Sequence, residues 1–199
     1  MGKLRELRPI FEGRGIAVID LVEFGLPETA EEDGLEVFST FEENATAKAK
    51  YFQRRTGLPT VADDSGLAVV ALGGRPGVLS KRWSGRSDLS GQALDDENNR
   101  LLLEALANTE DRRAMYVCAA AFVDESLEIV CRGEVSGVID RVGHGSNGFG
   151  YDPFFVSSEL GCSFGAASTA EKERVSHRGR AFRGLIERLE RLATSGGGS

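Results

Sequence analysis

Hydrophobic and polar positions recur along the chain with two periods, one typical of helices and one typical of strands. Apolar residues at helical spacing predict three helices, over residues 4–11, 92–107 and 179–192. A fourth helix is predicted from Thr40, which forms a Thr-x-x-Glu capping box with Glu43, to about Gly57. Ser168 and Glu171 repeat the capping pattern and predict a fifth helix. Helices are therefore expected at both ends and in the middle of the chain.

Short apolar runs between these helices predict strands over residues 16–24, 58–62, 67–72, 114–123, 127–131, 135–139 and 151–156. Residues 63–66, Asp-Asp-Ser-Gly, separate two of the runs and favour a hairpin turn, because Asp, Ser and Gly are turn formers. The order of elements indicates an α/β protein with a mixed β-sheet and two lobes. We expect one domain over residues 1–193, followed by a flexible Gly-rich tail over residues 194–199.

Composition narrows the class of protein. The chain has 199 residues, of which 41% are hydrophobic and 28% charged, as in an ordinary globular protein. Its formal charge of −7 argues against nucleic acid or an anionic membrane as the main partner. No apolar run approaches the roughly 18 residues of a membrane span, and the first residues show no signal peptide. Three widely spaced cysteines fit neither a disulfide framework nor a zinc site. These features predict a soluble, cytoplasmic protein.

Two adjacent aspartates, Asp63 and Asp64, are the first candidates for chemistry. Hydrolysis of a triphosphate needs carboxylates that hold Mg²⁺, cations that hold phosphate oxygens, and a base that orients water. Because neighbouring residues of an extended segment point to opposite faces, only one of the two carboxylates can face a given site. On spacing alone, the turn and the catalytic interpretation both stay open.

Further candidates are polar groups on the predicted helices and loops. Asn44 and Lys48, four residues apart, share one helical face. A basic cluster at a helix junction consists of Lys172, His177 and Arg178. Taken singly, both groups are typical of solvated surface. Residues 148–152, Gly-Phe-Gly-Tyr-Asp, would let a base stack on an aromatic ring and would equally begin a bulged strand.

The order of five separated motifs is more specific than any one of them. Along the chain they read TFEENATAKA (40–49), ADDSGL (62–67), LGGRPGVLSKRW (72–83), GFGYDPFF (148–155) and EKERVSHRGRA (171–181). This series resembles the inosine/xanthosine triphosphate pyrophosphatase family, whose members clean the nucleotide pool. The resemblance extends from residue 2 to about residue 192.

The resemblance implies a fold, a reaction and an assembly. The implied fold is an elongated mixed β-sheet flanked by helices in two lobes, with the nucleotide in a cleft between them. The implied reaction is Mg²⁺-dependent hydrolysis of non-standard purine triphosphates (ITP, dITP and XTP) to the monophosphate and pyrophosphate. The implied assembly is a homodimer.

Position within the motifs assigns an implied role to each site residue. Asp64 matches a general base and Mg²⁺ ligand, and Ser65 lies beside it on the nucleotide. Lys3 and Lys48 match lysines that contact the phosphates. The segment that packs on the purine is Phe149, Gly150, Tyr151 and Asp152. Three basic residues match donors that reach the base edge: Lys172, His177 and Arg178. Such donors can bind an oxygen at C6 of the purine but find no acceptor in the amino group of adenine.

The chain departs from the family pattern in two places. An apolar first strand and the asparagine of the phosphate loop are missing before Lys3, so we expect the natural protein to begin upstream of Met1. Residues 35–39 look like an insertion, which leaves Glu31, Glu32 and Glu36 as alternatives for a second metal ligand. Of these three, Glu32 is our choice.

Two other functions fit the same residues less well. A pyrophosphatase of the same fold acting on modified pyrimidines is disfavoured by the Ser-His-Arg-Gly segment at residues 176–179. A non-catalytic nucleotide-binding or dimerisation module, disabled by the missing N-terminal segment, is disfavoured because Asp64, Lys48 and the basic cluster are all present. Release of pyrophosphate from inosine triphosphate separates the enzyme from the module.

Overall fold

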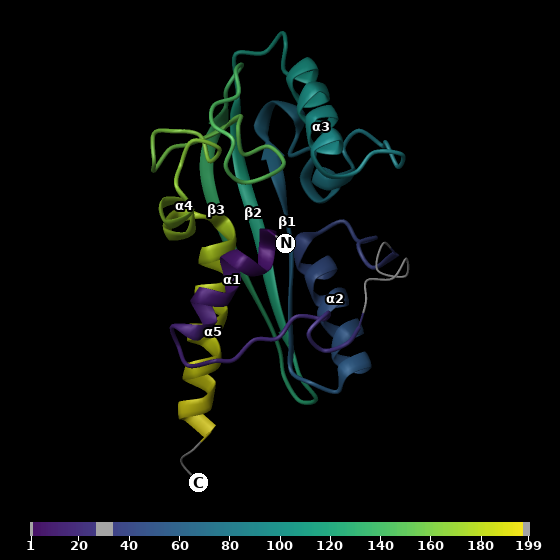
Figure 1. Cartoon of the computed structure of the whole chain (residues 1–199), viewed down its shortest axis with the longest axis vertical. Helices are drawn as coiled ribbons and strands as arrows, with labels where there is room; N and C mark the ends of the chain where they lie inside the picture. Colours follow the sequence, from purple (N-terminus) through teal and green to yellow (C-terminus); the bar gives the residue numbers. More distant parts are fainter. Residues whose placement is uncertain (1, 27–33, 197–199) are drawn as a thin grey trace. The chain divides into compact units, whose positions relative to one another are not determined.

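A computed structural model describes residues 2–26 and 34–196 of the chain (Figure 1). Four strands pair in the order β1-β2-β3-β4, as an antiparallel sheet flanked by helices. The strands are β1 (Thr60–Val69), β2 (Arg113–Val123), β3 (Glu128–Ile139) and β4 (Phe155–Ser157). The helices are α1 (Gly2–Glu12), α2 (Phe41–Thr56), α3 (Gly91–Ala105), α4 (Thr169–Val175) and α5 (His177–Gly196), with 3₁₀ turns at η2 (Val70–Leu72) and η3 (Gly77–Arg82). The predicted α/β class is confirmed.

The chain divides into two compact units, each with its own core. The first unit comprises Met1–Asp64, Cys118–Gly133 and Arg178–Ser199, and the second comprises Ser65–Val117 and Glu134–His177. In the first unit α1 lies against α5 (Figure 1), and Phe11 meets Phe182 edge-on with ring centroids 5.7 Å apart. In the second unit the centre is a cluster of rings, in which Tyr116 stacks on Phe164 at 5.9 Å.

Local capping signals place the ends of two helices correctly. The Thr40 hydroxyl accepts the Glu43 N–H at 3.2 Å, and Gly57 ends α2 in the left-handed conformation, as the sequence predicts. Ser168 and Glu171 form the complete capping box at the start of α4. These boundaries depend on contacts within a few residues, which is why the sequence reveals them.

The strand predicted over residues 16–24 is wrong. The segment is irregular and then turns, and Ile19 and Val22 are 56% and 72% exposed. The Asp20 carboxylate accepts the Glu23 N–H at 2.6 Å, while the Glu23 carboxylate accepts the Asp20 N–H at 2.8 Å. These local hydrogen bonds satisfy backbone donors that a sheet ladder would otherwise need.

The turn predicted at residues 63–66 is also wrong, because β1 runs without a break through all four residues. Likewise, the two strands expected over residues 127–139 are the single strand β3. The strand expected from residue 151 is shorter: Gly150 adopts φ 62°, residues 150–154 turn, and β4 begins only at Phe155. At residues 63–66 strand pairing overrides the local turn propensity, whereas at residues 150–154 the chain turns although its apolar residues favour a strand.

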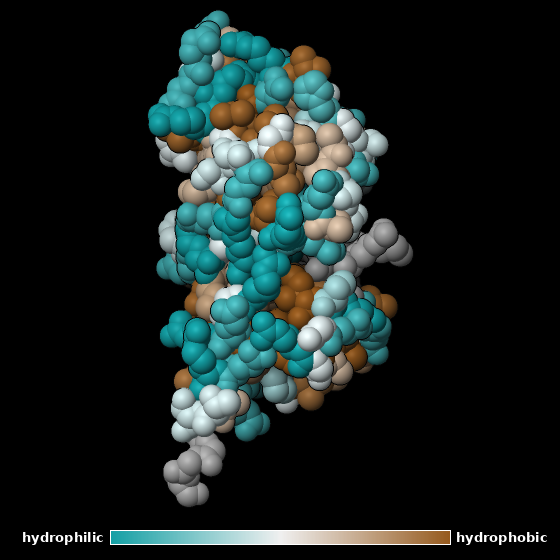
Figure 2. Space-filling model, turned by 90° about the vertical axis from the view of Figure 1, so that its left-hand side faces the viewer, coloured by the Kyte–Doolittle hydropathy of each residue, from teal (hydrophilic) through white to brown (hydrophobic). Residues whose placement is uncertain are grey.

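The C-terminal helix continues into the segment predicted to be a flexible tail. The Thr194 and Ser195 hydroxyls both donate to the Arg191 carbonyl, at 2.9 and 2.8 Å, and hold the last turn of α5 up to Gly196. Within the described residues, no helix combines the length and the apolar character that crossing a membrane requires. The face drawn in Figure 2 is mostly hydrophilic, with hydrophobic residues in separate patches.

Candidate active site

The first unit holds the Asp64 carboxylate between two side chains of α2. Asp64 is 4% exposed, and its Oδ2 accepts a hydrogen bond from Asn44 Nδ2 at 2.9 Å. Its other oxygen, Oδ1, lies 3.8 Å from Lys48 Nζ. Asn44 and Lys48 are four residues apart, so one face of α2 presents both to the strand. The helical spacing predicted that shared face.

Asn44 is buried, which corrects the surface interpretation of its sequence position. Its side chain is fully covered, its Oδ1 accepts the Phe38 N–H at 2.9 Å, and its Nδ2 also contacts the Phe38 carbonyl at 3.3 Å. The amide therefore ties the backbone before α2 to the carboxylate on β1. Buried polar groups are normally hydrogen-bonded. These three hydrogen bonds fix the orientation of the Asn44 amide and, through it, that of the Asp64 carboxylate.

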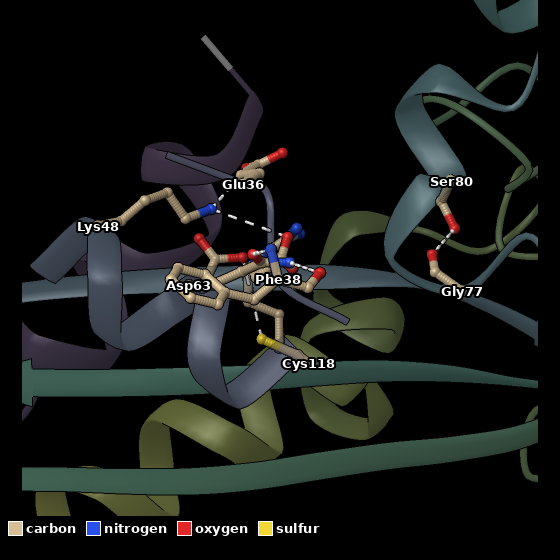
Figure 3. A network of polar contacts seen from close by, with 10 residues as sticks. Glu36, Phe38, Lys48, Asp63, Gly77, Ser80 and Cys118 are labelled. Atoms are coloured by element: carbon tan, nitrogen blue, oxygen red, sulfur yellow. Dashed lines mark hydrogen bonds and ion pairs between the residues drawn. The ribbon is translucent and has the colours of Figure 1, made fainter. Parts of the chain in front are cut away.

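Lys48 has a second, closer carboxylate partner in Glu36. The two charged atoms lie 2.7 Å apart, and Figure 3 shows the Lys48 side chain reaching towards Glu36. The side chains are 14% and 23% exposed, so the pair is partly shielded from solvent. Sequence reasoning named Glu36 only as one of three alternatives and preferred Glu32, which lies outside the described residues.

Asp63 faces the other way along β1 and has a separate set of partners. Arg178 Nε donates to Asp63 Oδ2 at 3.2 Å, and Cys118 Sγ lies 3.9 Å from the same oxygen (Figure 3 shows the Asp63–Cys118 contact). Arg178 is 3% exposed, so the surface interpretation of the basic cluster is wrong for this residue. The alternation of the strand thus separates a carboxylate paired with arginine from one held by an amide and a lysine.

The second unit contains the predicted base-packing segment, held around Asp152. The Asp152 carboxylate accepts the Phe149 N–H at 2.9 Å and pairs with Lys172 Nζ at 2.7 Å. A Cβ on Gly148 would lie 2.0 Å from Asp152 Oδ2, so only glycine fits there. The Tyr151 hydroxyl donates to the Ser80 carbonyl at 2.7 Å. Burial, followed by the negative charge of Asp95, raises the pKa of Tyr151, which keeps this hydroxyl a donor.

The basic residues of the second unit are buried against rings. Lys172 is 6% exposed, with Nζ 5.1 Å from the centroid of the Phe149 ring. His177 is 5% exposed and stacks on Tyr116, with centroids 4.7 Å apart and planes 7° from parallel. Phe149 itself is 42% exposed. The sequence cluster is therefore part of the interior, while the neighbouring aromatic face stays open to solvent.

Three predicted site residues have less structural support. Ser65 is half-buried on β1 in the second unit. The backbone of Lys3 lies in the first turn of α1, and its side chain is outside the described part of the structure. Glu32 lies outside the described residues. Conversely, sequence reasoning missed Asp95 and Asn99 of α3, which bind the Gly150 backbone, because nothing in their own segment indicates that contact.

The donor set around Asp64 suits a hard cation. Among residues 2–26 and 34–196, no three His, Cys, Asp or Glu side chains gather as a complete protein metal site would. Mg²⁺, however, is commonly held by one or two carboxylates together with substrate phosphates and water. The Asp64 carboxylate, with Oδ1 3.8 Å from Lys48 Nζ, meets that simpler requirement of a single protein carboxylate.

Known proteins resemble this chain over nearly its whole length. The sequence model of the Ham1 family matches residues 1–188. The dITP/XTP pyrophosphatase of Mycobacterium tuberculosis (strain ATCC 25618 / H37Rv) is 48% identical over 198 residues, which cover 96% of this chain and 92% of that protein. The dITP/XTP pyrophosphatase of Frankia alni is 46% identical over 196 residues, covering 97% of this chain and 95% of that protein.

Solved structures agree with the sequence comparisons. A HAM1 protein from Coxiella burnetii superposes with a TM-score of 0.81 at 36% identity, covering 95% of this chain and 93% of that one. A nucleoside-triphosphatase / dITP/XTP pyrophosphatase from Mycobacterium abscessus gives a TM-score of 0.70 at 42% identity, covering 94% of each chain. At 36% and 42% identity, these two proteins resemble this chain in sequence as well as in fold.

The two aspartates of β1 should differ in their effect on stability. We expect Asp63→Asn to lower the free energy of unfolding by about 3 kcal/mol, because it removes the negative charge that the buried Arg178 guanidinium contacts. Asp64→Asn keeps an oxygen that can accept from Asn44 and should cost about 1 kcal/mol. Urea unfolding of both variants measures the difference, and equal losses would contradict the assigned partners.

Proposed function

Because the chain belongs to the Ham1 family, we propose that it hydrolyses non-standard purine nucleoside triphosphates, namely ITP, dITP and XTP, to the monophosphate and pyrophosphate. The observation that carries the proposal is the buried Asp64 carboxylate, held by Asn44 and Lys48 on one face of α2. The relatives named dITP/XTP pyrophosphatase support the same reaction. An enzyme is favoured over a non-catalytic binding module because these relatives are hydrolases and the polar groups around Asp64 are assembled.

Asp64 is the proposed general base. Pyrophosphate is released when water attacks the α-phosphorus, so the base must orient that water and accept its proton. Asn44 holds Oδ2, which fixes the direction of Oδ1. A carboxylate whose rotation is already restricted orients water without further reorganisation. Asn44 is in this role a positioning residue, because it acts through Asp64.

We infer that the metal is Mg²⁺ and that Asp64 is one of its ligands, with Glu32 as the second predicted ligand. When bound, Mg²⁺ would neutralise negative charge on the triphosphate as pyrophosphate leaves. Asp64 supplies the hard oxygen donor that this ion prefers. Glu36, which shares the ammonium of Lys48 with Asp64, is the described glutamate nearest to such a role.

Lys48 is the proposed phosphate contact of the first unit, and Lys3 stays a prediction for the same role. In the structure the Lys48 ammonium already binds the Glu36 carboxylate at 2.7 Å. A phosphate oxygen offers the same charge and hydrogen-bonding character as a carboxylate oxygen. We therefore infer that triphosphate binding exchanges Glu36 for a phosphate oxygen on Lys48.

The second unit supplies the proposed recognition of the base. Phe149 presents an open ring on which a purine can stack. Lys172, held by Asp152, and His177 supply donors for an oxygen at C6, whereas the amino group of adenine would leave these donors without an acceptor. Gly150, Tyr151 and Ser65 are proposed nucleotide contacts, as is Arg178.

We also infer a homodimer and a cytoplasmic location, as the resemblance to the family implies. The formal charge of −7 argues against nucleic acid or an anionic membrane as the main partner. Sedimentation of the purified protein tests the assembly directly.

Asp64→Asn should remove at least about 99.9% of turnover, since it removes both the proposed base and a metal ligand. Pyrophosphate release from dITP at saturating Mg²⁺ measures the effect. Asp124→Asn, at a half-buried residue of the turn between β2 and β3 in the same unit, keeps an oxygen that can accept the Leu127 N–H; it is the matched control and should retain wild-type activity. Turnover by Asp64→Asn within a few-fold of wild type would rule out the assigned role.

Selectivity for the base should favour a C6 oxygen. We expect kcat/KM for dITP to exceed that for dATP by at least about a hundredfold, the scale reached by sites with committed hydrogen-bond partners. The rejection of dGTP, which shares the C6 oxygen, must depend on the C2 side of the base. Comparable kcat/KM values for dITP and dATP would refute this account of base recognition.

Glu36→Gln should lower KM for dITP about fivefold, because a partly shielded ion pair worth about 1 kcal/mol no longer competes for Lys48. The inhibition constant of pyrophosphate should fall in parallel. Glu42→Gln removes an exposed pair with Arg132 on the same unit and should change neither constant. A rise in the Mg²⁺ concentration needed for half-maximal activity, without a lower KM, would instead identify Glu36 as a metal ligand.

A further inference from the structure

The backbone of Gly150 is held from both sides by helix α3. Its N–H donates to Asp95 Oδ2 at 2.8 Å, and its carbonyl accepts from Asn99 Nδ2 at 2.9 Å. Asp95 and Asn99 are four residues apart, so they lie on one face of α3, one turn from each other. All three residues belong to the second unit. Two successive turns of α3 therefore bind both backbone polar groups of Gly150.

Gly150 is needed here for its conformation. Its φ of 62° is one that other residues adopt only with strain, whereas an added Cβ would meet no atom within 4 Å. The neighbours of Gly150 are anchored as well, through the Phe149 N–H to Asp152 and the Tyr151 hydroxyl to Ser80. The segment thus has a defined backbone, from which the Phe149 ring projects with 42% of its surface exposed.

The same support holds the ring and the basic donor beside it. Asp152 binds both the Phe149 N–H and Lys172 Nζ, and Lys172 Nζ lies 5.1 Å from the Phe149 ring centroid. A base stacked on this ring would meet the Lys172 donor only if ring and ammonium keep this relation. Because Gly150 adjoins Phe149, a displaced Gly150 would shift the ring while Lys172 stayed paired with Asp152.

We propose that Asp95 and Asn99 are positioning residues that set the selectivity between purines, by holding Gly150 and through it Phe149. This inference rests on the proposed base recognition by Phe149 and Lys172. Neither Asp95 nor Asn99 contacts the base; each acts through the Gly150 backbone. If Gly150 is no longer held, a base stacked on Phe149 shifts relative to the Lys172 ammonium. A base with a C6 oxygen then loses its hydrogen bond to Lys172, whereas adenine, which has no oxygen at C6, makes no such bond in either case. The preference for hypoxanthine should therefore fall.

The test compares adjacent aspartates of one helix. Asp95→Ala and Asn99→Ala should each lower the ratio of kcat/KM for dITP to that for dATP about tenfold, mainly through a higher KM for dITP. Asp96→Ala is the matched control, since Asp96 is exposed and contacts only the side chain of Gln92 among the hydrogen bonds described. Asp95→Asn keeps an oxygen that can accept the Gly150 N–H, and should recover most of the selectivity.

A second measurement separates this inference from the proposed reaction. Calorimetry gives the affinity ratio of IMP to AMP without any turnover, and hydrogen exchange reports the Gly150 amide. In Asp95→Ala we expect a lower IMP-to-AMP ratio and faster exchange at Gly150 than in Asp96→Ala. Wild-type protein that binds IMP selectively but does not hydrolyse dITP would overturn the reaction and leave this inference standing. Selectivity in Asp95→Ala and Asn99→Ala equal to that of Asp96→Ala overturns the inference.

Discussion

A carboxylate that is buried on folding is stable only when a cation or hydrogen-bond donors replace its lost water. Two neighbouring residues of β1 have to meet this requirement. Asp63 and Asp64 are both buried, and the alternation of the strand sends their side chains to opposite faces. Asp63 pairs with Arg178, whereas Asp64 is held by Asn44 and Lys48. One aspartate is thus committed to a buried ion pair, and the other keeps an oxygen directed towards a lysine that can exchange partners.

The second unit follows the same rule with a different outcome. Lys172 is buried, and its charge is balanced by Asp152, which also holds the backbone of Phe149. Pairing with Asp152 fixes the position of this proposed donor in the absence of a purine, so that binding of a base would need little reorganisation. The α3 contacts to Gly150 extend this support to the segment that carries the exposed ring. Charge neutralisation and site geometry are therefore provided by the same residues.

Each unit contains a lysine that the proposed reaction needs, and in each unit a carboxylate of the protein pairs with that lysine. For Lys48 that partner is Glu36, in the segment before α2, where the side chains are only partly covered. For Lys172 the partner is Asp152, which is 3% exposed. The difference in burial suggests different behaviour towards an anionic substrate: a partly solvated pair can open at low cost, while a buried pair is retained. In the proposed reaction, phosphate binding would therefore use a lysine that changes partner, and base recognition a lysine that keeps its partner.

Local patterns in the sequence sufficed for the family, the α/β class and several helix ends, because motif order and capping at Thr40 and Ser168 involve residues close in the chain. The sequence also limited each site face to one of the two aspartates. It misjudged residues 16–24 and 63–66, and the local pattern around Asn44, Lys172 and Arg178, taken alone, was typical of surface. Their burial depends on partners far along the chain, 20 residues away for Asp152 and Lys172 and 115 for Asp63 and Arg178. Turn propensity and charge act locally, whereas burial of a charge is decided by a partner that only folding brings within hydrogen-bonding distance.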